Sequence, residues 1–173
     1  MGTMQDNRGC MQLHDIHQRL TALGAGPLHV QRVLRTWVNA LPVHSGKRLP
    51  QHHFPRALLA ALPDVLGELQ GLATMRSEHP GEDGSARLLV ALNDGQTVES
   101  VRLPRGGLCV STQIGCAVGC TFCMTGTGGL IRQLGSAEIV AQVALARQQR
   151  SVNKVVFMGM GEPAHNLEAV LEA

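Results

Sequence analysis

The stretch LCVSTQIGCAVGCTFCMTGTGG (residues 108–129) joins an apolar run to a loop that is rich in cysteine and glycine. Cys116, Cys120 and Cys123 follow a C-x3-C-x2-C spacing on that loop. The chain has five cysteines and a polar N-terminus without the apolar core of a secretory signal, which argues against a disulfide framework. Three thiols on one short loop instead indicate a metal or redox centre, and the glycines let the backbone wrap closely around a bulky group.

Two kinds of metal centre fit these cysteines. A [4Fe–4S] cluster usually takes four cysteine ligands, so binding by three leaves one iron open to a ligand from outside the protein. A zinc site would need a fourth ligand, such as Cys109 or His165. Closed zinc sites favour paired C-x2-C motifs, so the spacing favours the iron–sulfur centre, and inert buried cysteines are the third alternative.

Strand and helix patterns alternate after the cysteine loop. A helix is expected over 136–150 with Ser136 as its N-cap, followed by a buried strand in NKVVFMG (153–159). The turn GMGEPAHN (159–166) leads into a second helix, with Asn166 as its expected cap. The order strand, loop, helix, strand, loop, helix is typical of parallel βα units and predicts an α/β fold.

The middle of the chain predicts a β-hairpin. RLLVAL (87–92) and TVESVRL (97–103) are strand-like runs separated by Asn-Asp-Gly-Gln, a strong turn signal. LCVSTQI (108–114) is expected to form a third, continuous strand. We expect it to pair in parallel with 154–158, which would leave one sheet edge open and part of the 136–150 helix uncovered.

The N-terminal third predicts a small helical domain. Apolar residues recur at helical spacing over 11–23, and a second helix begins at Pro27. Its apolar stripe consists of Val30, Val33, Leu34, Trp37 and Leu41. Arg32 and Arg35 fall opposite this stripe and are expected to face solvent. A third, short helix fits residues 55–62.

Charge divides the chain in a similar way. Residues 1–62 carry seven Lys or Arg against two acids, whereas 63–108 is net acidic. The basic third is either an electrostatic footprint for nucleic acid or an ordinary solvated surface. We expect three parts: a helical domain (1–62), a β-hairpin connector (63–106) and the start of the α/β domain (107–173).

Composition excludes several classes of protein. With 44% apolar and 16% charged residues, the chain is typical of globular rather than disordered proteins. No apolar run reaches the roughly 20 residues of a membrane span. The three Phe, one Trp and no Tyr nearly exclude base stacking on an aromatic platform. We therefore expect a cytoplasmic protein without membrane association.

The cysteine loop, with Phe122 just before its last cysteine, resembles the radical S-adenosylmethionine superfamily. GMGEP (159–163), one βα unit later, resembles the glycine-rich S-adenosylmethionine motif of that superfamily. More narrowly, residues 108–129 and VVFMGMGEPAHN (155–166) resemble the RlmN/Cfr family of RNA adenosine methyltransferases. The N-terminal helices, with HVQRVLRTWV, resemble its RNA-binding accessory domain more loosely. This resemblance implies a partial TIM-type (βα)6 barrel, with its first two βα units in 107–173.

The resemblance assigns roles to individual residues. The ligands of a [4Fe–4S] cluster would be Cys116, Cys120 and Cys123. Gly161 and Glu162 would contact the methionine moiety of S-adenosylmethionine. Cys109 matches the thiol that resolves a covalent enzyme–RNA adduct by forming a disulfide, and Glu99 matches the proton acceptor. The residues alone leave an alternative for each: Cys109 as a small buried strand residue, and Glu99 as a strand residue that faces water.

The chemistry implied by the family uses S-adenosylmethionine twice. One molecule methylates a second cysteine far downstream, and another is cleaved reductively to a radical that takes hydrogen from that methyl group. The methylene radical adds to adenine C2 (C8 in Cfr-type enzymes) of 23S rRNA, with tRNA as a second candidate substrate. The family further implies an electron donor such as flavodoxin and a monomer at full length.

No cysteine follows Cys123, so the methyl-carrying cysteine is absent from these 173 residues. We therefore expect the chain to be an incomplete, inactive portion of a longer enzyme. Two other functions remain open at this point: another radical S-adenosylmethionine enzyme, and a non-catalytic remnant that binds RNA or zinc.

Overall fold

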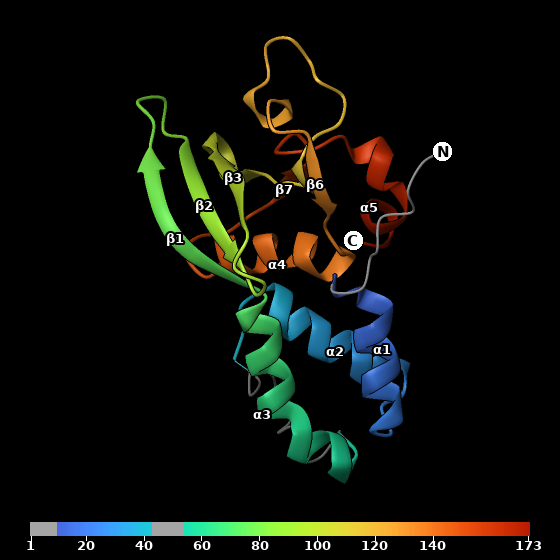
Figure 1. Cartoon of the computed structure of the whole chain (residues 1–173). Helices are drawn as coiled ribbons and strands as arrows, with labels where there is room; N and C mark the ends of the chain where they lie inside the picture. The colour runs from blue at the N-terminus through green and yellow to red at the C-terminus, as the bar shows by residue number, and fades with distance from the viewer. Residues whose placement is uncertain (1–9, 43–53) are drawn as a thin grey trace, which may run out of the picture.

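The computed structural model describes residues 10–42 and 54–173, so the basic residues Arg8, Lys47 and Arg48 lie outside the described residues. The helices are α1 (Leu13–Ala22), α2 (Pro27–Val38), α3 (Arg56–Gly71), α4 (Ser136–Arg147) and α5 (Leu167–Glu172). The strands are β1 (Ala73–Pro80), β2 (Ala86–Leu92), β3 (Thr97–Leu103), β4 (Gly107–Cys109), β5 (Gln113–Gly115), β6 (Leu130–Gln133) and β7 (Lys154–Val156). Figure 1 shows α4 between the N-terminal helices and the strands. The fold is mixed α/β, as expected.

The first two helices match the sequence pattern, with two corrections. Leu41 lies beyond the end of α2 and is exposed, so it does not belong to the buried stripe. Arg32 is partly buried, with its guanidinium carbon 5.7 Å from the centre of the Phe54 ring, so only Arg35 faces solvent as expected. A cation above an aromatic face is attracted by the ring quadrupole, which explains why Arg32 turns inward.

The third helix is longer than expected. We predicted it over 55–62, and a proline such as Pro63 usually ends or kinks a helix. It continues through Pro63 to Gly71, and Leu66 and Leu69 from the added turns are buried. Burial of these two side chains offsets the hydrogen bond that proline removes.

The main sheet has the strand order β1-β2-β3-β4-β7. The predicted β2–β3 hairpin is confirmed. The predicted parallel pairing is also confirmed, between β4 and β7, with Leu108 opposite Val155. Strand β1, whose sequence is polar, was not predicted and pairs antiparallel with β2. A second, two-stranded sheet joins β5 to β6 antiparallel.

The continuous strand expected over 108–114 is instead two short strands in different sheets. Between them, the backbone N–H and C=O of Ser111 both bond the Gln142 side-chain amide of α4, each at 2.9 Å. This amide takes the place of a neighbouring strand at the break. The backbone there remains fully hydrogen-bonded, so the chain can pass from one sheet to the other without leaving backbone N–H or C=O groups unpaired.

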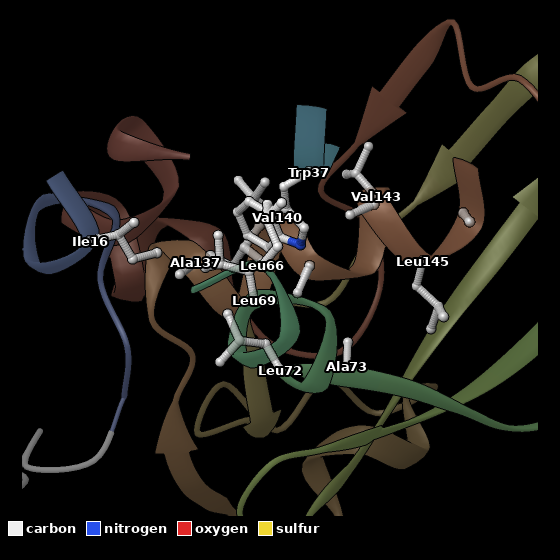
Figure 2. Close-up of a cluster of buried hydrophobic side chains, with 14 of the residues drawn as sticks. Ile16, Trp37, Leu66, Leu69, Leu72, Ala73, Ala137, Val140, Val143 and Leu145 are labelled. Carbon is white, nitrogen blue, oxygen red and sulfur yellow. The ribbon is translucent and has the colours of Figure 1, made fainter. Parts of the chain in front are cut away.

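Helix α4 is covered on all sides, contrary to the incomplete cover that we expected. Every residue from Ser136 to Ala146 is buried. Figure 2 shows Ala137, Val140 and Val143 of α4 beside side chains of the N-terminal helices. The N-terminal helices and the sheet therefore sandwich α4, and this layer forms the core of the described part of the chain.

The start of α4 also differs by one residue from the expectation. Gly135 is the N-cap, and Ser136 is the first helical residue. The buried carboxylate of Glu138 accepts a 2.8 Å hydrogen bond from the Gly135 backbone N–H, which satisfies one of the free donors at the helix start. Among the described helices, none is long and apolar enough to cross a membrane.

Candidate functional site

The cysteine loop (residues 116–129) connects β5 to β6 and extends from the top of the molecule in Figure 1. Its two ends are joined by a 3.1 Å hydrogen bond from the Cys116 N–H to the Gly129 carbonyl. At its far end, the Cys123 N–H donates to the Cys120 carbonyl at 3.0 Å, which forms a tight turn. The loop is therefore a closed, backbone-bonded structure that carries all three thiols of the motif.

Glycine is required where the loop begins. Gly115 has a φ of +75°, a conformation that residues with a Cβ rarely adopt. A Cβ at this position would lie 2.0 Å from the Gly129 carbonyl oxygen, the same atom that closes the loop. The absence of a side chain at Gly115 thus allows the two ends of the loop to approach each other.

The three thiols differ in their surroundings. Cys116 is buried, Cys123 is half-buried and Cys120 is exposed, and none forms a disulfide. Hydrogen bonds from the side chain and backbone of Thr125 lower the pKa of Cys123, which favours the thiolate that binds metals. Large apolar side chains on the same loop are exposed, including Phe122 at 90%.

The loop suits an iron–sulfur cluster by its chemistry. Soft thiolates are the ligands of such clusters, and Gly115 lets the two ends of the loop that carries them approach closely. In residues 10–42 and 54–173, no three His, Cys, Asp or Glu side chains are already gathered for metal binding. Neither candidate for the fourth zinc ligand is gathered with the three thiols. Cys109 lies within β4, and His165 is exposed.

The glycine-rich turn (residues 159–163) is bonded to the chain just before the cysteine loop. The Met160 carbonyl accepts hydrogen bonds from the backbone N–H groups of Thr112 and Gln113, at 2.9 and 3.2 Å. The Met160 N–H in turn donates to the Ser111 hydroxyl at 2.8 Å. The two motifs are 30 residues apart in sequence, and the structure joins them through residues 111–113.

Gly161 and Glu162 lie against Gln113. Gly161 has a φ of +98°, and a Cβ there would lie 2.5 Å from the Cβ of Gln113. The Glu162 N–H donates to the Gln113 side-chain oxygen at 2.7 Å. The Glu162 carboxylate accepts the Ala164 N–H at 3.0 Å and is partly exposed. This carboxylate is accessible to a cationic ligand group.

Contrary to our expectation, the side chain of Asn166 does not cap α5. Asn166 occupies the N-cap position, but its amide donates to the carbonyls of Thr112 and Leu134, each at 2.8 Å. Asn166 therefore attaches residues 162–166 to the residue just before β5 and the residue just after β6. A capping residue and a fastening residue have the same sequence signature, so the sequence could not distinguish them.

Glu99 and Cys109 share one face of the main sheet. Cys109 pairs with Val101, and Glu99 lies two residues before Val101, so all three point to the same side. This is the face opposite α4, because Ser100 on the other face donates to Gln142 at 2.8 Å. The structure thus brings both predicted catalytic residues to one face of the sheet. The backbone N–H of Glu99 also lies 3.3 Å from the sulfur of Met160 in the glycine-rich turn.

The two side chains have different electrostatic environments. The Glu99 carboxylate is partly exposed and lies 3.5 Å from the Arg87 guanidinium. Cys109 is buried, and burial raises the pKa of its thiol, an effect that a hydrogen bond with the Met158 backbone opposes. Cys109 therefore remains a neutral thiol at neutral pH and needs a base, or a higher pH, to become a nucleophile.

Four polar residues of the site were not singled out from the sequence. They are Ser111, Gln113, Gln133 and Gln142. Ser111, Gln113 and Gln142 are fully buried in the structure, where unpaired polar groups would be costly. The available signals were the polar Ser-Thr-Gln segment within the strand-like run 108–114 and the polar Gln142 within an apolar helix pattern.

Comparison with known proteins places these features in context. No family model matches the chain. It is 66% identical over 163 residues to a "Probable RNA methyltransferase" of Leptothrix cholodnii, a match that covers 94% of this chain and 47% of the relative. It is 60% identical over 165 residues to a "Probable RNA methyltransferase" of Pseudomonas aeruginosa, covering 94% of this chain and 48% of the relative. The chain thus spans about half the length of the curated relatives it matches.

The fold has a counterpart of established structure. It is similar to the crystal structure of a radical SAM methyltransferase from Sphaerobacter thermophilus, with a TM-score of 0.68 and 32% sequence identity. That match covers 94% of this chain and 49% of the other. The α/β architecture of the chain is therefore that of part of a radical SAM methyltransferase structure.

Proposed function

We propose that the chain is part of a radical S-adenosylmethionine RNA methyltransferase and carries its cluster-binding and cofactor-binding loops. The observation that carries this proposal is the joining of the cysteine loop and the glycine-rich turn through residues 111–113. A cluster ligand set and a methionine-binding turn must lie side by side if one substrate is to contact both. The identity of 60–68% to relatives named probable RNA methyltransferases supports the RNA substrate.

In this proposal Cys116, Cys120 and Cys123 are the ligands of a [4Fe–4S] cluster. When bound, the cluster supplies the electron that cleaves S-adenosylmethionine reductively. Gly161 brings the turn backbone close to the methionine moiety, and the exposed Glu162 carboxylate binds its ammonium group. The reductant is a flavodoxin-type electron donor.

The target proposed for the whole protein is adenine C2 of 23S rRNA, with tRNA as a second substrate and C8 as the alternative position. Glu99 accepts the adenine ring proton, and its partly exposed carboxylate is accessible to an adenine of the RNA. Cys109 resolves the covalent enzyme–RNA adduct by forming a disulfide with the methyl-carrying cysteine. No cysteine follows Cys123, so that partner thiol lies outside these 173 residues.

The same proposal assigns a role to each of the three parts of the chain. We assign residues 1–62 to RNA binding, 63–106 to a connector and 107–173 to the first two βα units of the barrel. Helix α2 would present Arg35 to the RNA phosphates, since that side chain is exposed. The whole protein would act as a cytoplasmic monomer.

The test uses the protein at the length of its relatives, reconstituted anaerobically with iron and sulfide. Incubation with S-adenosylmethionine, reductant and unmodified 23S rRNA should yield 2-methyladenosine by mass spectrometry. Cys109→Ala should leave RNA covalently attached to the enzyme, whereas Cys10→Ala is the matched control and should release product normally. Zinc in place of iron, or full product release by Cys109→Ala, would contradict the proposal.

A further inference from the structure

Three hydrogen bonds form a chain of amides beside the site. The Glu162 N–H donates to Gln113 Oε1 at 2.7 Å, and Gln113 Nε2 donates to Gln133 Oε1 at 2.8 Å. Gln133 Nε2 then donates to the His165 carbonyl at 2.9 Å. We call Gln113 and Gln133, with these three bonds, the amide relay. It begins at Glu162 in the glycine-rich turn, passes through both strands of the small sheet and ends at His165, just after the turn.

The relay lies at the end of the small sheet that faces away from the cysteine loop. Gln113 is the first residue of β5 and Gln133 the last residue of β6, and the two are direct partners in the antiparallel pair. The loop leaves from the other ends of the same two strands. Any change in the spacing of these short strands therefore moves both amides and, through them, both ends of the 162–165 segment.

The burial of Gln113 makes its contacts specific. Its side chain is fully buried, and its oxygen and its nitrogen each have a partner in the relay. An apolar replacement would leave the Glu162 N–H without this acceptor, and an unpaired donor favours opening of the turn. Close contact with Gly161 adds a steric reason for the turn to follow Gln113.

We propose that Gln113 and Gln133 are positioning residues that couple the order of the glycine-rich turn to the order of the cysteine loop. The identity of the groups that the cysteine loop and the glycine-rich turn bind rests on the proposed function. The coupling itself rests on the three hydrogen bonds of the relay. An ordered loop fixes the spacing of β5 and β6, the relay transmits that spacing, and the turn is held in one geometry. A loop without its cluster leaves the turn free to open.

The first arm of the test uses the cluster-free chain and measures amide hydrogen exchange at Glu162 by NMR. Gln113→Met, which has a similar shape but no amide, should speed exchange roughly fivefold. Gln133→Met should speed it by a smaller factor, of about two, because Gln113 keeps its own bond to Glu162 but loses its support. Gln133→Glu retains the acceptor for Gln113 but loses the donor to the His165 carbonyl, so its exchange rate at Glu162 should lie between those of the native chain and Gln133→Met. Gln70→Met, on the exposed side of α3, is the control.

Equal rates in Gln133→Met and Gln133→Glu would overturn the relay, and so would a native rate in Gln113→Met. If Gln113→Met does not fold, the Gln133 pair decides, because Gln133 is only partly buried.

The second arm adds ferrous iron and sulfide under anaerobic conditions and follows deuterium uptake in peptides spanning 159–166. Reconstitution should slow uptake in the native chain and in Gln133→Glu, and much less in Gln113→Met. Equal slowing in all variants would contradict the coupling. Failure to retain iron would count against the proposed function, while the cluster-free arm would still decide whether the relay exists.

Discussion

Replacement of Gly115 by alanine tests whether the closed base of the cysteine loop depends on the missing side chain. The positive φ alone costs alanine about 1–2 kcal/mol. The Cβ would also overlap the Gly129 carbonyl oxygen at 2.0 Å. Relief of this overlap adds about 1–3 kcal/mol, and loss of the Cys116 N–H bond to the same oxygen adds about 1 kcal/mol.

Gly84→Ala is the matched control. Gly84 has a similar φ of +81°, and a Cβ there would meet nothing within 4 Å. It therefore carries the conformational cost without the overlap, so Gly115→Ala should be less stable than Gly84→Ala by about 2–4 kcal/mol. At this chain length the difference lowers Tm by roughly 4–16 °C. The assay is thermal unfolding followed by circular dichroism, with iron content after reconstitution as a second measure. Equal Tm values and equal iron in the two variants would refute the reasoning.

Three further predictions concern charges and thiols. Arg132→Met should lower the free energy of unfolding in urea by about 3–5 kcal/mol. The Glu138 carboxylate is 1% exposed and lies 2.8 Å from the Arg132 guanidinium, so the substitution leaves a buried charge without its cationic partner. A loss below 1 kcal/mol would count against this prediction. Iodoacetamide at neutral pH should modify Cys123 before Cys109, because the pKa of Cys123 is lowered and that of Cys109 is raised, and raising the pH should narrow the difference; the reverse order by peptide mass spectrometry would be inconsistent. Arg35→Gln should reduce the salt dependence of RNA affinity by about 0.9 in log–log slope, and an unchanged slope would mean that the side chain touches no phosphate.

Local patterns predicted much of the fold. The apolar spacing of α2, the Asn-Asp-Gly-Gln turn between β2 and β3, and the apolar runs at β4 and β7 each reflect interactions within a few residues or between adjacent strands. The order of the βα units followed from the change in period along the chain. These features depend on backbone geometry and side-chain burial, which the sequence carries locally.

The features that the sequence missed depend on distant partners. The strand over 108–114 breaks because Gln142, 31 residues after Ser111, supplies the missing backbone partner. Pro63 lies inside α3 because the helical turns that follow it bury Leu66 and Leu69 in the core. Asn166 bonds two remote carbonyls in preference to its own helix. In each case a tertiary contact overrides the local preference.

The sequence indicated candidate site residues but not the hydrogen bonds that connect them. The sequence indicated both motifs, and the strand pattern placed Glu99 and Cys109 on strands. The bonds that join the motifs run through Ser111, Gln113 and Gln133, whose roles appear only once the strands are paired. In the sequence, the polar Ser-Thr-Gln segment within the strand-like run 108–114 was the sign of these connections.

The central claim, that this loop holds a three-cysteine iron–sulfur cluster, is tested most directly by metal and sulfide content after anaerobic reconstitution. The native chain should bind iron and acid-labile sulfide and show a broad visible absorbance that bleaches with dithionite. Single substitutions Cys116→Ser, Cys120→Ser and Cys123→Ser should each abolish this signal, while Cys109→Ser and Cys10→Ser should retain it. Loss of the cluster in Cys109→Ser, or binding of zinc without sulfide, would contradict the account.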